Sequence, residues 1–532
     1  MVMKKITMLF VTALSLFFTA LFAQQEYLDD TFGSNGIIFQ NYTDTLTGAN
    51  FESEFKTIVF QPDGKFITGS NFHQHGPNQR YIINQYNSDG TLNPAFGTNG
   101  FIESNVDNSI GAVQLQSDGK IIASSVEGNY DSSFSYLIRY NADGSVDNSF
   151  GVNGTVMDTV NTIKSFSIRL NDKIVVAKMP DYVGFSPNFK IERYSADGQL
   201  DVGFGTNGTV EFSLVQSKIS VQHLVIQDDG KMMICGLVRS DDVDDYSSNI
   251  ILLRFDDDGS LDSTFGDAGI KVFDYSYNDY FYDLLIQPDG KLIFSSSSHA
   301  VESINRIMRL NVDGSLDRTF GNGGITTIDY PILRVFSIKQ LPNGKLIVAG
   351  IYETSVNPSP SDNPTPTAVM IGCYDTNGYL DLDFGQNGYI ITAIENHRVL
   401  DDKLAIQSDG KILVGATFSN AWFSTHPRAA VLRYNPDQNL SIPQFNNKST
   451  FLLYPNPVGE TVTIDFTLKQ SEELSIDLYG NDGRKIVNLL KNQEFQSGFN
   501  SRKLEMPDNL SRGIYFLTIS NGTNTVNIKI VK

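Results

Sequence analysis

The sequence has 532 residues, with 60 acidic and 40 basic side chains and a formal charge of −20. At 40% hydrophobic and 19% charged residues it is too apolar for a disordered chain, and its length predicts two or more cores or one large repeat array. The acidity lies in residues 24–445, which hold 51 acidic and 28 basic side chains and no basic run. We therefore expect no nucleic-acid partner, because a phosphate backbone requires Lys and Arg.

The N-terminus has the order of a secretory signal peptide. Lys4 and Lys5 precede an apolar run that ends in Ala23, and polar Gln24 follows at once. We predict a signal peptide over residues 1–23 with cleavage after Ala23, and a mature protein outside the cytoplasm. The alternative is an uncleaved membrane anchor, because the run is near spanning length.

A first repeated element combines two apolar stretches around a turn and a lysine, as in FQPDGKFI at 60–67. Asp-Gly between β-prone runs supplies the turn of a β-hairpin. The third copy, at 169–176, lacks the glycine, so Asn171 and Asp172 should make its turn. The element occurs seven times, with lysines at Lys65, Lys120, Lys173, Lys231, Lys291, Lys345 and Lys411.

A second element alternates with the first, as in YNADGSVDNSFGVNG at 140–154. With the β-prone runs beside it, each unit contains four short strands, which favours a propeller blade over a helical solenoid or a β-helix. Seven units predict seven blades. We place them at 37–93, 101–147, 155–200, 209–262, 270–317, 325–381 and 389–440.

The two ends of the array are complementary. LDDTFGSNG at 28–36 is the second half of the motif with no blade before it, and the last copy, at 434–446, lacks that half. This predicts a ring closed by the N-terminal segment, which would remove exposed sheet edges. The two motifs together resemble the delta-sixty repeat, a bacterial secreted repeat. The resemblance covers residues 24–445 and implies the propeller fold but no activity.

A different domain follows the linker 446–450. Residues 451–532 alternate β-prone runs with Asn-Gly-type turns, which predicts a small β-sandwich. The whole chain should thus be all-β, a seven-bladed β-propeller followed by a small C-terminal β-sandwich.

The tail resembles the type A sorting domain of the type IX secretion system of Bacteroidetes. The residues that carry this resemblance are Tyr454, Pro455, Asn456, Pro457, Gly513, Ile514, Tyr515, Lys529 and Lys532. The resemblance implies export through the periplasm to the outer-membrane surface or the medium. It also implies the type IX machinery and a sortase-like peptidase as partners, and release or attachment to surface lipopolysaccharide.

The sequence contains few candidates for chemistry. Asp256, Asp258 and Asp262 form the most acidic copy of the second motif, which favours either a weak calcium site or a turn whose acids cap their own backbone. No catalytic motif or other cofactor site is found. Cys235 and Cys373 lie in apolar runs, so we expect both to be buried and free.

Function should lie where the repeat is broken, because acids that recur in every unit are structural. The loops at 72–80, 357–367 and 420–428 break it, and the last holds the only tryptophan, Trp422. Trp422 is our candidate ligand contact, with packing between blades as the alternative. We expect a secreted or surface binding or adhesion module. A propeller hydrolase or lyase acting on extracellular glycans and a structural surface component remain alternatives.

Overall fold

The computed structural model describes most of the chain. The described residues are 27–40, 52–73, 79–104, 108–129, 132–169, 171–180, 184–242, 247–275, 278–299, 303–328, 332–353, 367–394, 397–419, 427–435, 452–454, 458–468, 471–480, 485–507, 510, 514–521 and 525–532. The predicted signal peptide, Ala23 and the linker 446–450 lie outside them. In the described part, no helix is long and apolar enough to cross a membrane.

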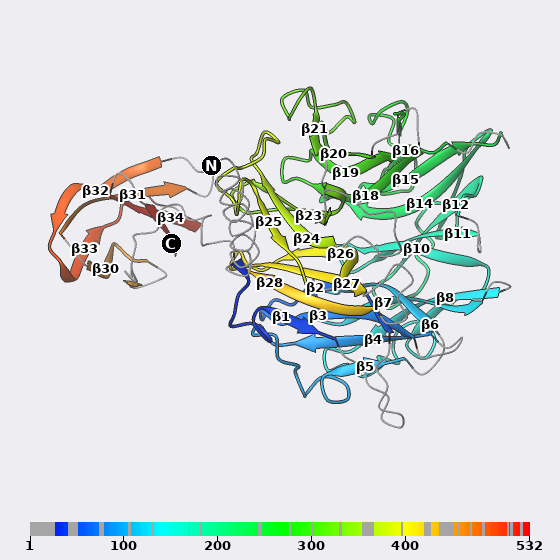
Figure 1. The fold of residues 1–532 in the computed structure, drawn as a ribbon, viewed down its shortest axis with the longest axis horizontal. Coiled ribbons are helices and arrows are strands. Elements are labelled where there is room, and N and C mark those ends of the chain that lie inside the picture. The colour runs from blue at the N-terminus through cyan, green and yellow to red at the C-terminus, as the bar shows by residue number, and fades with distance from the viewer. Residues whose placement is uncertain are drawn as a thin grey trace, which may run out of the picture. The chain divides into compact units, whose positions relative to one another are not determined.

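The chain divides into two compact units, Met1–Pro436 and Asp437–Lys532. The described part of the first unit forms seven four-stranded antiparallel sheets, which we number as blades 1 to 7 (Figure 1). Blade 1 consists of β2 (Glu52–Phe60), β3 (Phe66–His73), β4 (Gln79–Tyr86) and β5 (Phe101–Glu103). Blade 2 consists of β6 (Asn108–Leu115), β7 (Ile121–Asn129), β8 (Ser132–Tyr140) and β9 (Thr155–Asp158). Blade 3 consists of β10 (Asn161–Ile168), β11 (Ile174–Pro180), β12 (Asn188–Tyr194) and β13 (Thr209–Ser213).

The remaining blades follow the same order. Blade 4 consists of β14 (Ser217–Ile226), β15 (Met232–Ser240), β16 (Asn249–Phe255) and β17 (Ile270–Phe273). Blade 5 consists of β18 (Asn278–Ile286), β19 (Leu292–His299), β20 (Ser303–Leu310) and β21 (Ile325–Ile328). Blade 6 consists of β22 (Ile332–Gln340), β23 (Leu346–Glu353), β24 (Thr367–Tyr374) and β25 (Tyr389–Thr392). Blade 7 consists of β26 (Arg398–Ile406), β27 (Ile412–Ser419), β28 (Arg428–Tyr434) and β1 (Ile37–Phe39).

The blades form a closed ring. The first strand of each blade contacts the first strands of its neighbours, in the order β2, β6, β10, β14, β18, β22, β26 and back to β2. These first strands are therefore the innermost ones. The N-terminal β1 pairs with β28 through Ile37–Leu432 and completes blade 7 (Figure 1). The predicted closure by the N-terminal segment is confirmed.

The predicted blade boundaries were wrong by one strand. The strand that follows each copy of the second repeated element does not open the next blade but pairs with the third strand of its own blade, as β5 does with β4. The reason is the tight turn of the motif, which reverses the chain and brings the next strand back antiparallel to the one before it. Each blade thus starts one strand later than expected.

Turn chemistry explains the hairpins between the first and second strands. Gly64 takes a φ of 86° in the first copy, and in the third copy Asp172 takes the left-handed position with a φ of 59°. The β10–β11 hairpin forms without a glycine, as predicted. Hydrophobic cores lie between neighbouring blades, and Phe32 and Phe55 join Leu413 and Val431 in the core that closes the ring.

The second unit is a two-sheet sandwich. One sheet orders β29 (Leu452–Tyr454), β30 (Thr461–Leu468) and β33 (Gly498–Glu505); the other orders β32 (Lys485–Phe495), β31 (Glu472–Gly480), β34 (Ile514–Ser520) and β35 (Thr525–Val531). Ile464 of the first sheet and Ile476 of the second share one buried core. The prediction of an all-β propeller followed by a small sandwich is confirmed.

The sorting-motif residues fall in and around the strands of this sandwich. Tyr515 is buried in β34, and the Lys532 ammonium donates a hydrogen bond to the Gly459 carbonyl at 2.7 Å. Tyr454, Ile514 and Lys529 lie in β29, β34 and β35. Pro455, Asn456, Pro457 and Gly513 lie outside the described residues.

Candidate functional site

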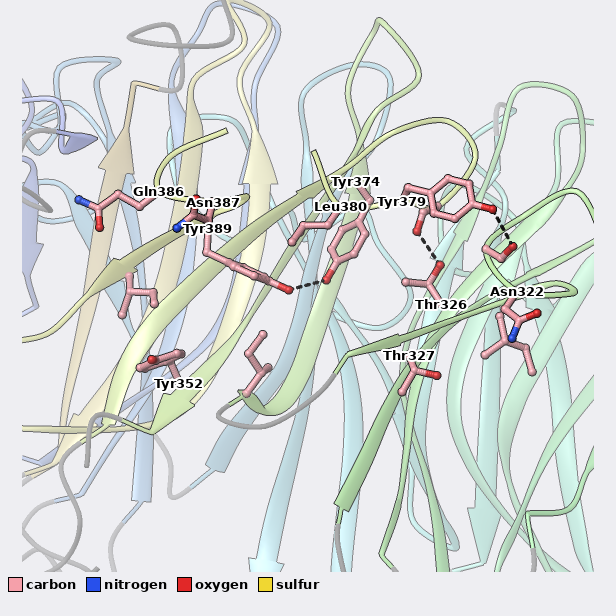
Figure 2. Close-up of a pocket in the computed structure, with 15 residues that line it drawn as sticks. Asn322, Thr326, Thr327, Tyr352, Tyr374, Tyr379, Leu380, Gln386, Asn387 and Tyr389 are labelled. Atoms are coloured by element: carbon pink, nitrogen blue, oxygen red, sulfur yellow. Dashed lines mark hydrogen bonds between the residues drawn. The ribbon is translucent and has the colours of Figure 1, made fainter. Parts of the chain in front are cut away.

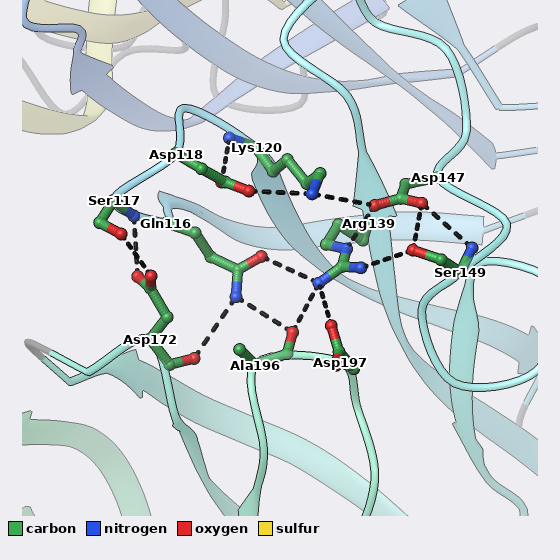
Figure 3. A network of polar contacts seen from close by, with 10 residues as sticks. All are labelled: Gln116, Ser117, Asp118, Lys120, Arg139, Asp147, Ser149, Asp172, Ala196 and Asp197. Carbon is green, nitrogen blue, oxygen red and sulfur yellow. Dashed lines mark hydrogen bonds and ion pairs between the residues drawn. The ribbon is translucent and has the colours of Figure 1, made fainter.

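The repeated lysine and an aspartate of the second motif form an ion-pair cluster with an arginine of the third strand. In blade 2, Arg139 Nε lies 2.8 Å and Lys120 Nζ 3.6 Å from the same Oδ2 atom of Asp147 (Figure 3). The same three residue types meet in blades 3, 4, 5 and 7, as Lys173–Asp201–Arg193, Lys231–Asp262–Arg254, Lys291–Asp317–Arg309 and Lys411–Asp29–Arg433.

The arginine of each cluster also binds the turn of the next blade. Arg139 Nη1 donates to the Ala196 carbonyl at 2.6 Å, and its guanidinium lies over the Phe150 ring at 4.9 Å. Arg433 donates to the Ser88 carbonyl and so joins blade 7 to blade 1. The most regular part of the repeat therefore holds neighbouring blades together.

Local hydrogen bonds keep these aspartates ionised. The Ser149 hydroxyl donates to Asp147 Oδ1 at 2.6 Å and is the main cause of a lowered pKa of the Asp147 carboxyl, aided by Arg139 and opposed by burial. A carboxylate that pairs with two cations and lies inside a repeat is a structural group. These contacts support the interpretation of the repeated acids as structural.

We expect loss of a cluster arginine to destabilise the propeller strongly. Arg254 and Asp262 side chains are only 2% and 3% exposed, and Lys231 is the other cation at Asp262. Arg254→Met would remove the buried cation and leave the carboxylate with the more exposed Lys231 alone, which should cost about 3 kcal/mol in the free energy of unfolding. Arg80 pairs with Glu103 at the surface, and Arg80→Met should cost less than about 1 kcal/mol. Urea unfolding of both variants tests this, and equal losses would contradict it.

Two blades depart from the cluster. In blade 1 the ion pair is replaced by amides, and Asn93 Nδ2 donates to Gln85 Oε1 at 2.5 Å. In blade 6, Lys345 still pairs with Asp381 at 2.6 Å, but Cys373 stands at the arginine position. Burial raises the pKa of the Cys373 thiol to about 12, so it stays protonated. Cys235 and Cys373 are both free and buried, as predicted.

The three calcium candidates are engaged in protein contacts. Asp256 pairs with Lys231, Asp262 belongs to the ion-pair cluster of blade 4, and Asp258 Oδ1 accepts hydrogen bonds from the Ser260 N–H and hydroxyl at 2.9 and 2.7 Å. The predicted capping turn is thus present. Among the described residues, no group of three or more metal-ligating side chains could hold an ion, and calcium binding stays a prediction.

The three repeat-breaking loops, at 72–80, 357–367 and 420–428, occupy equivalent places in blades 1, 6 and 7. Each connects the second strand of its blade to the third, so their described ends lie at the end of the sheets opposite the Asp-Gly turns. Most of each loop, including Trp422, lies outside the described residues. Trp422 as a ligand contact stays a prediction.

A pocket of about 850 Å³ lies in the groove between blades 5 and 6 (Figure 2). We call it the tyrosine groove. Its walls are the outer strand and preceding turn of blade 5 and the turns and strands of blade 6. Its lining residues are Gly321, Asn322, Ile325, Thr326, Thr327, Ile332, Tyr352, Tyr374, Gly378, Tyr379, Leu380, Gln386, Asn387, Tyr389 and Ile391.

Hydrogen bonds fix the aromatic side chains of this groove. The Tyr379 hydroxyl donates to the Gly321 carbonyl at 3.3 Å, across the two blades, and the residue remains 60% exposed. The Tyr374 and Tyr389 hydroxyls are 3.2 Å apart. Figure 2 shows the Tyr379 ring beside the blade 5 turn and the Tyr389 ring directed toward Tyr374.

The tyrosine groove differs from the repeat at these positions. Tyr379 stands where the other copies have Thr91, Ser145, Gln199, Ser260 and Ser315, and Tyr389 where they have Phe101, Thr155, Thr209, Ile270 and Ile325. Sequence reasoning missed the site because it looked for departures in the loops, and the signal was a substitution within the motif itself.

The equivalent groove between blades 3 and 4 has different chemistry. It is about 580 Å³, and its lining includes Thr206, Ser260 and two acidic residues, Glu211 and Asp258. The described lining of the tyrosine groove contains no charged residue. The two grooves therefore occupy equivalent positions in the fold, but their lining residues differ in charge.

The innermost strands hold a second departure from the repeat. Asp402 of β26 pairs with Ala416, the register position that other blades fill with buried apolar residues. Those residues are Phe55, Ile110, Ile163, Val221, Phe281 and Val335. Neither carboxylate oxygen of Asp402 has a hydrogen-bond partner in the described part of the protein. Burial, reinforced by Asp401, raises the pKa of Asp402 to about 8.

The first unit is a ring of blades that its own N-terminal strand closes, and the second unit is a β-sandwich. This architecture defines a β-propeller protein with an accessory tail. Family models agree with both parts. Residues 452–532 match the secretion system C-terminal sorting domain, and five segments match the DUF5122 beta-propeller, a domain of unknown function, at 61–96, 116–150, 227–265, 287–320 and 407–439. These matches confirm both resemblances seen in the sequence. The chain is a β-propeller protein exported by the type IX secretion system.

Solved structures show likeness of fold only. A polysaccharide lyase, Uly1, is 10% identical to this chain, with a TM-score of 0.46. The match covers 74% of this chain and 92% of the lyase chain. A protein of unknown function from Dyadobacter fermentans DSM 18053 is 11% identical, with coverages of 75% and 100% and a TM-score of 0.36. An endo-arabinase from Bacteroides thetaiotaomicron VPI-5482 is 9% identical, with coverages of 52% and 97% and a TM-score of 0.27. No curated protein matches the sequence.

Proposed function

We propose that the protein is an extracellular binding or adhesion module whose ligand contacts the tyrosine groove. The observation that carries this proposal is the replacement of repeat residues by Tyr379 and Tyr389 in a pocket of about 850 Å³. Ligand sites are concave, largely apolar or aromatic, and carry a few polar groups. The tyrosine groove has this composition.

We infer that delivery follows the order of the two terminal segments. The N-terminal segment directs the chain into the periplasm, and the C-terminal tail engages the type IX machinery. A sortase-like peptidase then removes the tail near residues 446–450, and the propeller is released or joined to surface lipopolysaccharide. The mass of the exported protein tests this step, because an intact tail in the exported form would contradict it.

A retention assay with product analysis tests the binding function. The purified chain from residue 24 onward is incubated with immobilised polysaccharides and peptides, and the mass of each ligand is measured afterwards. We expect retention of at least one ligand with its mass unchanged. Retention that survives replacement of Tyr379 would place the ligand elsewhere and contradict the proposed site.

An enzymatic function has one observation in its favour. Asp402 is a buried carboxyl that breaks the repeat in an innermost strand, and such perturbed groups concentrate at functional sites. The innermost strands as a whole are not acidic, since they hold six acidic and seven basic residues. Smaller ligand products that disappear in Asp402→Asn would establish this alternative in place of binding.

A further inference from the structure

We infer that the tyrosine groove selects an uncharged glycan. This inference rests on the proposed function and adds the chemical class of the ligand. It follows from three properties of the groove: the absence of charge from its described lining, the hydrogen-bonding groups it leaves available, and an exposed aromatic ring held in place.

The first property is electrostatic. The chain carries a formal charge of −20, yet none of the described residues that line the groove is charged. An acidic polymer would be repelled by the surrounding protein and would find no Lys or Arg in this lining to pair with. A cationic ligand would find no carboxylate there, whereas the groove between blades 3 and 4 offers Glu211 and Asp258. An uncharged ligand suits the tyrosine groove best.

The second property is hydrogen-bonding capacity. The side-chain amides of Asn322, Gln386 and Asn387 are exposed, and none of the hydrogen bonds described for the protein uses them. An amide offers both donors and an acceptor. Sugar hydroxyl groups likewise donate and accept, so amides on both walls of the groove match a polyhydroxylated ligand. A proline-rich peptide lacks most backbone N–H donors and would leave the amide oxygens unused. An ordinary extended peptide carries one donor and one acceptor per residue, so the aromatic ring described next is what favours a sugar over it.

The third property is the Tyr379 ring. A tyrosine has an apolar face and a polar tip, which suits the alternating apolar and hydroxylated surfaces of a sugar ring. The hydrogen bond from its hydroxyl to Gly321 restrains the ring, while the residue stays 60% exposed. Because the ring is already positioned, binding loses little side-chain freedom.

The experiment compares three ligand classes by titration calorimetry with the chain from residue 24 onward. The probes are uncharged hexasaccharides of glucose, xylose and mannose, an oligogalacturonate as an acidic glycan, and proline-rich and mixed peptides. We expect an uncharged glycan to bind at least about tenfold more tightly than the acidic glycan and the peptides.

The test variants restore residues that other blades contain, so they are compatible with the fold. Tyr379→Ser introduces the residue of blades 4 and 5, and should weaken glycan binding about tenfold. The double variant Gln386→Thr with Asn387→Gly introduces residues of the third and fifth copies and removes both amides. Leu382→Ser is the matched control, because Leu382 lies three residues after Tyr379 and is 66% exposed but does not line the groove.

The outcomes separate this inference from the proposed function. Preference for the acidic glycan or a peptide, with binding lost in Tyr379→Ser, would overturn the glycan inference and leave the binding site standing. Glycan binding that is unchanged in Tyr379→Ser and in the double variant would overturn the groove as the site. Failure of every probe to bind would count against both.

Discussion

Removal of residues 27–39 is expected to abolish cooperative folding of the propeller at physiological temperature. The deletion takes away β1, which pairs with β28, and so opens the ring. It also removes Phe32 from a core and Asp29 from its ion pairs with Lys411 and Arg433, at 3.2 and 3.0 Å. Loss of a fully buried aromatic residue and of a buried ion-pair partner each costs about 3 kcal/mol or more, which together approach the whole stability of a typical domain.

Thermal unfolding followed by circular dichroism measures this effect. Asp29→Asn is the intermediate variant, because it keeps β1 and removes only the charge that pairs with the two cations. We expect a lowered melting temperature in Asp29→Asn and no propeller transition in the deletion. An unchanged melt of the deletion variant would show that β1 does not stabilise the ring.

Asp402→Val is expected to stabilise the propeller, with a gain that grows as the pH rises. The variant introduces the residue that blades 4 and 6 contain at this position. Burial raises the pKa of Asp402 to about 8 from the usual value near 3.8. Between these values the folded protein retains a proton that the unfolded chain has released, so stability falls with rising pH at about 1.4 kcal/mol per pH unit and levels off above pH 8.

The wild-type protein should therefore lose stability between about pH 4 and pH 8 through this residue, and Asp402→Val should not. At pH 8 the gain has an upper bound on the order of 5 kcal/mol, and near pH 4 it should be small. Asp283→Val is the matched control. The Asp283 side chain is only 14% exposed, but Lys339 and His223 outweigh the effect of desolvation and lower its pKa. Asp283 also accepts hydrogen bonds from Ser337 and Ile338 at 3.0 Å.

Denaturant unfolding at pH 4.5 and pH 8 distinguishes the two aspartates. We expect Asp402→Val to be more stable than the wild type at pH 8, and Asp283→Val to be less stable at both pH values. A loss of stability in Asp402→Val at pH 8 would contradict the account of Asp402 as an unpaired buried acid.

The fold was predictable because the repeated motifs identify the turns and strands in the sequence. Asp-Gly turns such as that of Gly64 mark each hairpin, and the orphan half-motif at 28–36 marks the closure. The blade boundaries were not predictable from this pattern. A strand that follows a turn can pair with the strand before it or begin the next sheet, and the motif alone does not distinguish these cases.

Asp402 shows why part of the site escaped the sequence. Counting back from the turn lysine aligns Asp402 with Lys56, whose side chain is partly exposed and pairs with Glu54. In the structure a β-bulge lies between Phe55 and Thr57 in blade 1, but between Val399 and Asp401 in blade 7. This shift of one residue turns the side chain to the other face of the strand and gives Asp402 the place of Phe55.

The tyrosine groove escaped for a different reason. Tyr379 and Tyr389 lie in the most regular part of the chain, where the motif itself predicts a turn and a strand correctly. Only the spatial neighbourhood of blade 5, with Gly321 and Asn322 facing blade 6, shows that these two substitutions meet in one groove. Comparison of the copies position by position would have found the substitutions, but not their common site.

The central claim is that ligand binds where the repeat is broken between blades 5 and 6. Hydroxyl-radical footprinting of the exported protein, with and without the ligand that it retains, tests this most directly. We expect ligand to protect Tyr379 and Tyr389 while Leu382 and the exposed Val152 of blade 2 remain equally reactive. Protection confined to the loops at 72–80, 357–367 and 420–428, with both tyrosines unchanged, would contradict the claim and move the binding site to the opposite end of the sheets.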